Sequence, residues 1–183
     1  MERMAERARF GDRAERSKTV AATTRPDPGG TLAVAAAGTL LVLVAFTTPL
    51  TTLASTAAGL GAGSGALAWV LSSMSLGAAA GLLSSGAIGD DYGRRRTFLA
   101  GTLLLAGSSV LGAFAPTALV LVVARVSQGL GGAAVLACSL GLIGHAFPAG
   151  PARARATGVW GAALGTGVAV GPILAAGLDS LGG

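Results

Sequence analysis

The chain alternates between long apolar segments and short polar ones. After a polar beginning, five apolar segments follow, each close to or above the ~20 residues that a helix needs to cross a bilayer. This pattern predicts an all-α membrane protein with five transmembrane helices. The predicted spans are residues 32–53, 66–88, 97–115, 118–147 and 156–178.

The first 31 residues have mixed charge and end in the run Arg25-Pro26-Asp27-Pro28-Gly29-Gly30. Such a composition favours a disordered basic tail over residues 1–31, followed by a helix bundle over residues 32–183. A cleaved signal peptide is the alternative. Its apolar region normally covers ~7–15 residues, whereas this run is longer and more apolar segments follow. An uncleaved first span is therefore favoured.

Pro49 lies near the end of the first predicted span. Proline lacks a backbone N–H, so it predicts a kink, and the freed carbonyl groups need other donors inside a membrane. Four hydroxyl groups stand nearby for this purpose: Thr47, Thr48, Thr51 and Thr52. The uncharged linker of residues 54–65 is then expected to be an external loop.

Small and aromatic residues mark the predicted spans. Gly77 and Gly81 stand four residues apart on one face, a spacing that lets helices approach closely in a membrane. Trp69, Phe98 and Phe114 lie near span ends, where aromatic rings sit well at the boundary between lipid and water. We predict helix packing along the glycines and an aromatic belt at the ends.

Composition agrees with a membrane protein. The 183 residues are 52% hydrophobic and 11% charged, against roughly 25% charged in a soluble domain. The net charge of +5 does not indicate nucleic-acid binding, because seven of the thirteen basic residues precede residue 26 in a tail that also holds acids. There is no Ser/His/Asp set, metal cluster or phosphate loop, so neither an enzyme nor a cofactor is predicted. Cys138, in an apolar run, is expected to be a small buried residue.

The basic residues also predict orientation. Apart from Arg125, every Lys and Arg lies in the tail, between spans two and three, or between spans four and five. These segments fall on one side of the membrane, and short loops rich in Lys and Arg stay in the cytoplasm. We predict a multi-pass protein of the plasma (inner) membrane with a cytoplasmic N-terminus.

Arg125 is the first candidate for a functional residue, about two turns into the fourth span. An ionised side chain there costs ~2.5–3.5 kcal/mol on insertion scales, so it needs a bundle interior, a partner or a water-filled cavity. Gln128 follows one turn later and is expected to share its face, which Gly129 and Gly132 leave shallow. An arginine that snorkels to the interface is the less favoured alternative.

The second candidate is the charged turn of residues 86–96, which reads Gly-Ala-Ile-Gly-Asp-Asp-Tyr-Gly-Arg-Arg-Arg. Asp90 and Arg94 are its expected working pair. For Arg95 and Arg96, a solvated turn that satisfies the charge rule is the favoured interpretation. His145, at the same predicted side, is expected to be an interfacial residue.

Three motifs resemble the major facilitator superfamily of secondary transporters, in the order in which that family has them. The turn matches at Gly86, Asp90, Gly93, Arg94 and Arg95, although Asp91 stands where the family usually has a basic residue. The fourth span matches Arg-x-x-Gln-Gly-x-Gly at Arg125, Gln128, Gly129 and Gly131. The fifth matches the Gly-x-x-x-Gly-Pro of the antiporter branches at Gly167, Gly171 and Pro172, with Gly177 beyond.

The resemblance implies a fold with two six-helix halves, of which these five spans are most of the N-terminal one. It implies a drug/proton antiporter of the multidrug efflux branch that exports small hydrophobic or cationic compounds. Arg125 would then serve the central cavity and proton transfer, and Asp90 with Arg94 would hold a cytoplasmic gate closed. We expect an N-terminal fragment, inactive without its C-terminal half. A metabolite or sugar carrier of the same superfamily and a non-transport membrane module remain alternatives.

One absence limits the coupling mechanism. Residues 32–89 and 97–178 contain no Asp or Glu. Proton coupling needs an embedded group that gains and loses a proton, and arginine keeps its charge. The expected partners are therefore the lipid bilayer, a small-molecule substrate, protons and a C-terminal half that supplies the proton carrier.

Overall fold

The structure, a computed structural model, describes residues 27–50, 59 and 63–182. Within them the regular structure is helical, with no strand, and five long helices form the bundle. They are α2 (Pro28–Thr47), α4 (Ser64–Tyr92), α5 (Arg94–Ala113), α6 (Ala118–Ala146) and α7 (Pro151–Gly182). All five are long and apolar enough to cross a membrane. The prediction of an all-α membrane protein with five spanning helices is confirmed.

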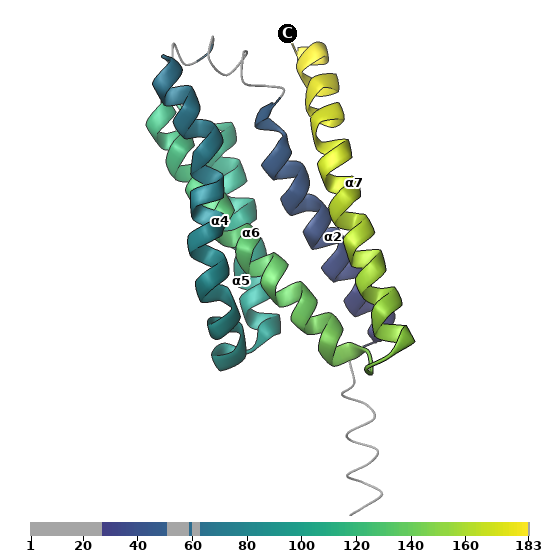
Figure 1. Ribbon diagram of the computed structural model, residues 1–183. Coiled ribbons are helices and arrows are strands. Elements are labelled where there is room, and N and C mark those ends of the chain that lie inside the picture. Colours follow the sequence, from purple (N-terminus) through teal and green to yellow (C-terminus); the bar gives the residue numbers. More distant parts are fainter. Residues whose placement is uncertain (1–26, 51–58, 60–62, 183) are drawn as a thin grey trace, which may run out of the picture.

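Helix α6 occupies the centre of the bundle. It packs against α4 and α5 on one side and against α2 on the other, and α2 in turn packs against α7 (Figure 1). Half of the apolar window of α6 is buried, compared with 17% for α2 and for α7. The outer helices therefore direct most of their apolar surface outward, as helices surrounded by lipid do, whereas α6 connects the two sides.

Glycine allows α4 and α6 to touch backbone to backbone. A Cβ atom on Gly77 would overlap the carbonyl group of Val126, and one on Gly129 would overlap the carbonyl oxygen of Met74. One turn further along α4, a Cβ on Gly81 would lie 2.7 Å from the Cβ of Ala133. The predicted contact stripe of Gly77 and Gly81 is confirmed.

Helix α2 begins at Pro28, four residues before the predicted start of the first span. The Asp27 carboxylate accepts hydrogen bonds from the N–H groups of Gly29 (3.2 Å) and Gly30 (2.9 Å), which caps the helix. Proline is tolerated at the first helical position because the backbone N–H that it lacks would have no acceptor within the helix. Residues 1–26 of the predicted tail, and residues 54–58 and 60–62 of the predicted external loop, lie outside the described part of the chain.

The other end of α2 shows the effect of the proline. The helix ends at Thr47, Thr48 is a turn residue, and Pro49 and Leu50 are again helical. The Thr47 hydroxyl donates to Leu43 O (2.9 Å) and the Thr48 hydroxyl to Val44 O (2.7 Å). The carbonyl that Pro49 frees is Ala45 O, four residues earlier, whereas these two bonds go to Leu43 O and Val44 O. They do not confirm the role expected for the two threonines, which stays a prediction. Thr51, Thr52 and the predicted end of the span at residue 53 lie outside the described residues.

The charged turn is shorter than predicted. Residues 86–92 continue α4, α5 starts at Arg94, and Gly93 alone separates the helices. Gly93 has φ = 95°, in the region that favours glycine. The prediction of a turn over residues 86–96 was wrong because the glycines of this segment also suit a helix that packs closely. A second glycine with positive φ, Gly150, precedes α7, which begins at Pro151 rather than at the predicted residue 156.

The aromatic belt is only partly as expected. Trp69 and Phe114 are exposed, at 60% and 82% of their surface, as boundary residues should be. Phe98 is 5% exposed and packs in a core with Val42 and Val135, so its assignment to the belt was wrong. Position along a span does not say which way a ring points. Cys138 belongs to the same core, as predicted.

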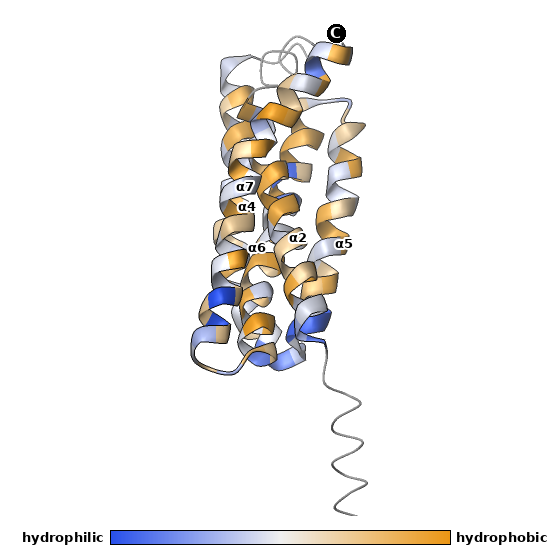
Figure 2. Cartoon of the chain, turned by 90° about the vertical axis from the view of Figure 1, so that its right-hand side faces the viewer, coloured by the Kyte–Doolittle hydropathy of each residue, from blue (hydrophilic) through white to orange (hydrophobic). Residues whose placement is uncertain are grey.

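Polar residues collect at one end of the bundle, opposite the C-terminus (Figure 2). This end holds the Gly93 turn, the turn between α6 and α7, and the start of α2 (Figure 1). We call it the basic end. Of the arginines in the described residues, all except Arg125 lie at this end, near the starts of α5 and α7.

Candidate functional site

Arg125 ties α6 to α2. Its Nη1 donates a hydrogen bond to the backbone carbonyl oxygen of Ala45, 2.9 Å away and 80 positions earlier in the chain. Its Nε is buried and has no hydrogen-bond partner within the described residues. The side chain is thus held inside the bundle by a neighbouring helix, in agreement with the interpretation favoured over snorkelling.

Gln128 connects α6 to a different helix. The side chain is 6% exposed, and its Nε2 donates to Ser109 Oγ on α5 at 3.0 Å. The Ser109 hydroxyl donates in turn to Leu105 O at 2.7 Å. Gln128 Oε1 is buried without a partner in the described residues. The amide therefore offers one buried acceptor besides its link to α5.

The prediction that Arg125, Gln128, Gly129 and Gly132 share one face was wrong. Arg125 and Gly132 face α2, where a Cβ on Gly132 would lie 2.9 Å from Val42 Cγ1. Gln128 faces α5 and Gly129 faces α4. Because α6 is central, neighbouring positions of the motif serve three different helices. Residues of the fourth-span motif and its neighbour Gly132 therefore pack or bond α6 against three different helices.

The fifth-span motif also acts on α2. A Cβ on Gly167 would lie 2.7 Å from Leu43 Cβ, and one on Gly171 would overlap Thr47 Oγ1. Pro172 lies inside α7 directly after this contact. Gly177 has open space around it. The last two turns of α2 are thus held between Arg125 of α6 and the glycines of α7.

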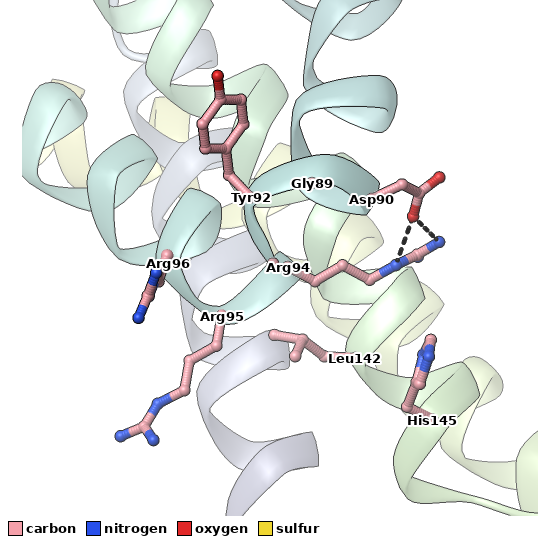
Figure 3. Close-up of a pocket in the computed structure, with 9 residues that line it drawn as sticks. Gly89, Asp90, Tyr92, Arg94, Arg95, Arg96, Leu142 and His145 are labelled. Atoms are coloured by element: carbon pink, nitrogen blue, oxygen red, sulfur yellow. Dashed lines mark hydrogen bonds and ion pairs between the residues drawn. The ribbon is translucent and has the colours of Figure 1, made fainter.

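At the basic end, Asp90 and Arg94 form the pair that the sequence predicts. Arg94 Nη2 and Nε both donate to Asp90 Oδ1, at 2.8 and 3.1 Å (Figure 3). This leaves Asp90 Oδ2 for a donor from elsewhere. The Arg94 guanidinium lies over Gly141 of α6, where any Cβ atom would overlap it. Glycine at 141 therefore lets the arginine cross α6.

Asp90 and Arg94 both line a pocket of about 580 Å³. Arg95 and Arg96 point away from Asp90 on the far side of the turn (Figure 3). His145 Nδ1 lies 2.9 Å from Gly141 O, a contact that leaves its expected interfacial role a prediction. The lining residues are Gly89, Asp90, Tyr92, Gly93, Arg94, Arg95, Arg96, Leu142 and His145. The pocket presents mainly positive charge at the end of the bundle.

Three contact partners were not found from the sequence: Ala45, Ser109 and Gly141. A backbone acceptor such as Ala45 O leaves no trace in residue identity. Ser109 is one of many hydroxyl-bearing residues in the spans, and Gly141 is one of thirty glycines. Pro49, four residues after Ala45, is the only local feature that indicates the acceptor. Within the described residues no group of three or more His, Cys, Asp or Glu side chains is placed to hold a metal ion.

Comparison with known proteins gives relatives for most of the chain. It is 44% identical over 112 residues to the multidrug resistance protein Stp of Mycobacterium tuberculosis, covering 61% of this chain and 21% of Stp. It is 41% identical over 106 residues to the multidrug efflux pump LfrA of Mycolicibacterium smegmatis, covering 58% and 21%. The puromycin resistance protein pur8 of Streptomyces alboniger is 38% identical over 160 residues, covering 86% and 32%.

The chain spans between about a fifth and a third of the length of these relatives. Residues 34–183 match the Major Facilitator Superfamily, and this range includes most of α2 and all of α4, α5, α6 and α7. With five helices that could span a membrane, a partly buried arginine fixed to a neighbouring backbone and this match over most of its length, the chain belongs to the Major Facilitator Superfamily.

Proposed function

We propose that this chain forms the N-terminal part of a proton-coupled transporter that exports small hydrophobic or cationic compounds. The partly buried side chain of Arg125, with a buried Nε and with Nη1 fixed to the α2 backbone, is the observation that carries the proposal. A charge in this position is costly in lipid and is typical of a substrate or ion pathway. The names of the relatives Stp, LfrA and pur8, which refer to drug resistance or efflux, support the substrate class.

The basic end supports a proposal for how the chain is oriented in the membrane. The arginines of both turns lie there together with the start of α2 (Figure 2). We infer that this end faces the cytoplasm and that the N-terminus is cytoplasmic, because arginine-rich short loops are retained on that side.

A second group of helices completes the transporter in this proposal. Alternating access requires two halves that rock around a site between them. Gly86 and Asp90 stand four residues apart on α4 and are both exposed, and a Cβ on Gly86 meets nothing within 4 Å. We infer that this face of α4 meets the C-terminal half when the cytoplasmic side closes.

Arg125 acts on the proton pathway indirectly. Its guanidinium stays charged, and residues 32–89 and 97–178 contain no carboxylate. We infer that the proton carrier belongs to the second half and that the positive charge of Arg125 favours its deprotonated form, as a nearby opposite charge does.

A chimera tests the proposal. In it, this chain replaces the matching segment of Stp, and the protein is expressed in a strain that lacks its own efflux pumps. We expect lower accumulation of cationic dyes and drugs, and we expect a protonophore to abolish the difference. A chimera that inserts correctly but exports no compound of this class, with or without a proton gradient, contradicts the proposal. It would favour a metabolite carrier or a non-transport module.

Asp90→Asn in the chimera should impair transport with little effect on stability. The pair with Arg94 is exposed, with the Asp90 side chain 63% accessible, and such i,i+4 pairs contribute only ~0.3–0.5 kcal/mol to folding. Drug efflux should fall several-fold because the carboxylate no longer binds the second half. Asp91→Asn, the adjacent exposed carboxylate, is the control and should transport normally. Equal transport by both variants would remove Asp90 from the gate.

Gly86→Leu should separate packing inside the chain from packing against the second half. The described residues leave the space beside Gly86 open, so the thermal stability of the 183-residue chain should change by less than ~0.5 kcal/mol. In the chimera, the same side chain should block closure and abolish efflux. Thermal unfolding and dye accumulation measure the two effects. Normal efflux by Gly86→Leu would show that no helix approaches this face.

A further inference from the structure

Near the end of helix α2, the carbonyl group of Ala45 lacks its backbone donor. In an α-helix, the carbonyl of residue i accepts a hydrogen bond from the N–H of residue i+4. For Ala45 the donor would be residue 49, which is proline and has no N–H. The preceding carbonyl, Val44 O, accepts from both the backbone N–H (3.0 Å) and the hydroxyl (2.7 Å) of Thr48. Val44 O therefore keeps its backbone donor, whereas Ala45 O lacks the one that residue 49 would supply.

The Arg125 guanidinium occupies this acceptor. Its Nη1 lies 2.9 Å from Ala45 O, and hydrogen bonds from ionised donors are roughly twice as strong as neutral ones. The segment of α2 that carries Ala45 also contacts α7, because Gly171 of α7 is packed against Val44 and Thr47. The segment of α2 around the Ala45 carbonyl is therefore held between α6 and α7.

We propose that Pro49 is a positioning residue for Arg125. By withholding an N–H from Ala45 O, it reserves this carbonyl for the guanidinium and fixes the charge at one depth in the bundle. The consequence for transport rests on the proposed function of Arg125. The positioning itself concerns only this chain and can be measured without transport.

The carbonyl of Ala45 can be observed directly. Ala–Phe pairs occur three times in the sequence, at Ala45–Phe46, Ala113–Phe114 and Ala146–Phe147. Labelling alanine with ¹³C at the carbonyl and phenylalanine with ¹⁵N therefore gives three resolved amide correlations for the 183-residue chain in lipid nanodiscs. The second and third pairs are internal controls.

Arg125→Met should shift the Ala45 carbonyl resonance, with no change at the two control pairs. In a Pro49→Ala background, the new N–H occupies the carbonyl, and Arg125→Met should then leave the Ala45 resonance unmoved. A carbonyl oxygen has two lone pairs and can accept twice. If Arg125→Met shifts the Ala45 resonance equally in both backgrounds, Arg125 binds regardless of residue 49 and the proposal is overturned. Pro49→Leu supplies the same N–H and replaces Pro49→Ala if the latter does not fold.

A double-mutant cycle gives an independent readout. Cys138 is the single cysteine of the chain and is buried, so its reaction with a thiol-reactive dye reports thermal unfolding. Arg125→Met should lower the midpoint by several degrees in the parent chain and by less than half as much in the Pro49→Ala background. Pro172→Ala is the matched control, since Pro172 lies within α7, whereas the carbonyl that Arg125 binds belongs to α2. A loss of equal size in all three backgrounds would overturn the proposal.

The transport assay separates this inference from the proposed function. In the chimera, Pro49→Ala should reduce efflux several-fold. If the cycle shows coupling but Arg125→Met exports drugs normally, Pro49 positions Arg125 and the proposed function falls. If Arg125→Met abolishes efflux but the cycle shows no coupling, the proposed function stands and the positioning role of Pro49 is wrong.

Discussion

Arg125→Met is expected to reduce drug efflux by the chimera tenfold or more. The guanidinium makes a charge-assisted hydrogen bond to Ala45 O inside the bundle. Hydrogen bonds to charged groups contribute about 1.5–3 kcal/mol, and each 1.4 kcal/mol corresponds to a factor of ten. Methionine keeps much of the side-chain length, so the change removes the charge and the donors rather than the packing. Accumulation of a fluorescent cationic dye in intact cells measures the loss.

Two further variants define what the assay reports. Arg155→Met removes an exposed arginine at the basic end and should leave efflux unchanged. Arg125→Lys keeps the charge but replaces the planar fork with a point charge, so it should recover only part of the activity. Normal efflux by Arg125→Met, at wild-type levels in the membrane, would remove this residue from the transport pathway.

Gly77→Val should give the largest loss of stability of any single substitution considered for this chain. A Cβ at this position would overlap the carbonyl group of Val126, so α4 and α6 have to separate. Overpacking of this kind costs about 1–3 kcal/mol, and the upper end applies because the obstacle is backbone that cannot change rotamer. The dye reaction of Cys138 during a thermal ramp should therefore begin at a markedly lower temperature.

The control for this variant is Gly107→Val. Gly107 lies in α5 and has nothing within 4 Å of its Cβ position, so the same chemical change is made where there is room. Its midpoint should stay close to that of the parent chain. If both variants lose the same stability, the cost belongs to valine in a helix rather than to the contact between α4 and α6.

Hydropathy predicted the number and approximate place of the helices because the energy of transfer into lipid depends on each segment by itself. The contact stripe of Gly77 and Gly81 was also predictable, since a spacing of four residues places both on one face of any helix. The Asp90–Arg94 pair was predictable for the same reason. These features are local along the chain.

What the sequence did not reveal depends on neighbours far along the chain. Phe98 was expected at the lipid boundary but fills space beside Gly38, whose Cβ would lie 2.9 Å from its ring. Arg125 and Gln128 were expected on one face, yet each bonds to a different helix. Periodicity gives the angle between two side chains around a helix. It does not say how many helices surround it, and α6 has neighbours on three sides.

The single glycine between α4 and α5 constrains any movement of the basic end. Because only one residue connects the two helices, a displacement of α4 along its axis must also move α5. Asp90 and Arg94 sit on either side of this joint and travel as one unit, with their mutual contact unchanged. If these two residues bind the second half of the transporter, opening would break that contact and leave the Asp90–Arg94 contact intact. The short connection at Gly93 would return both charges to the same position each time the cytoplasmic side closes.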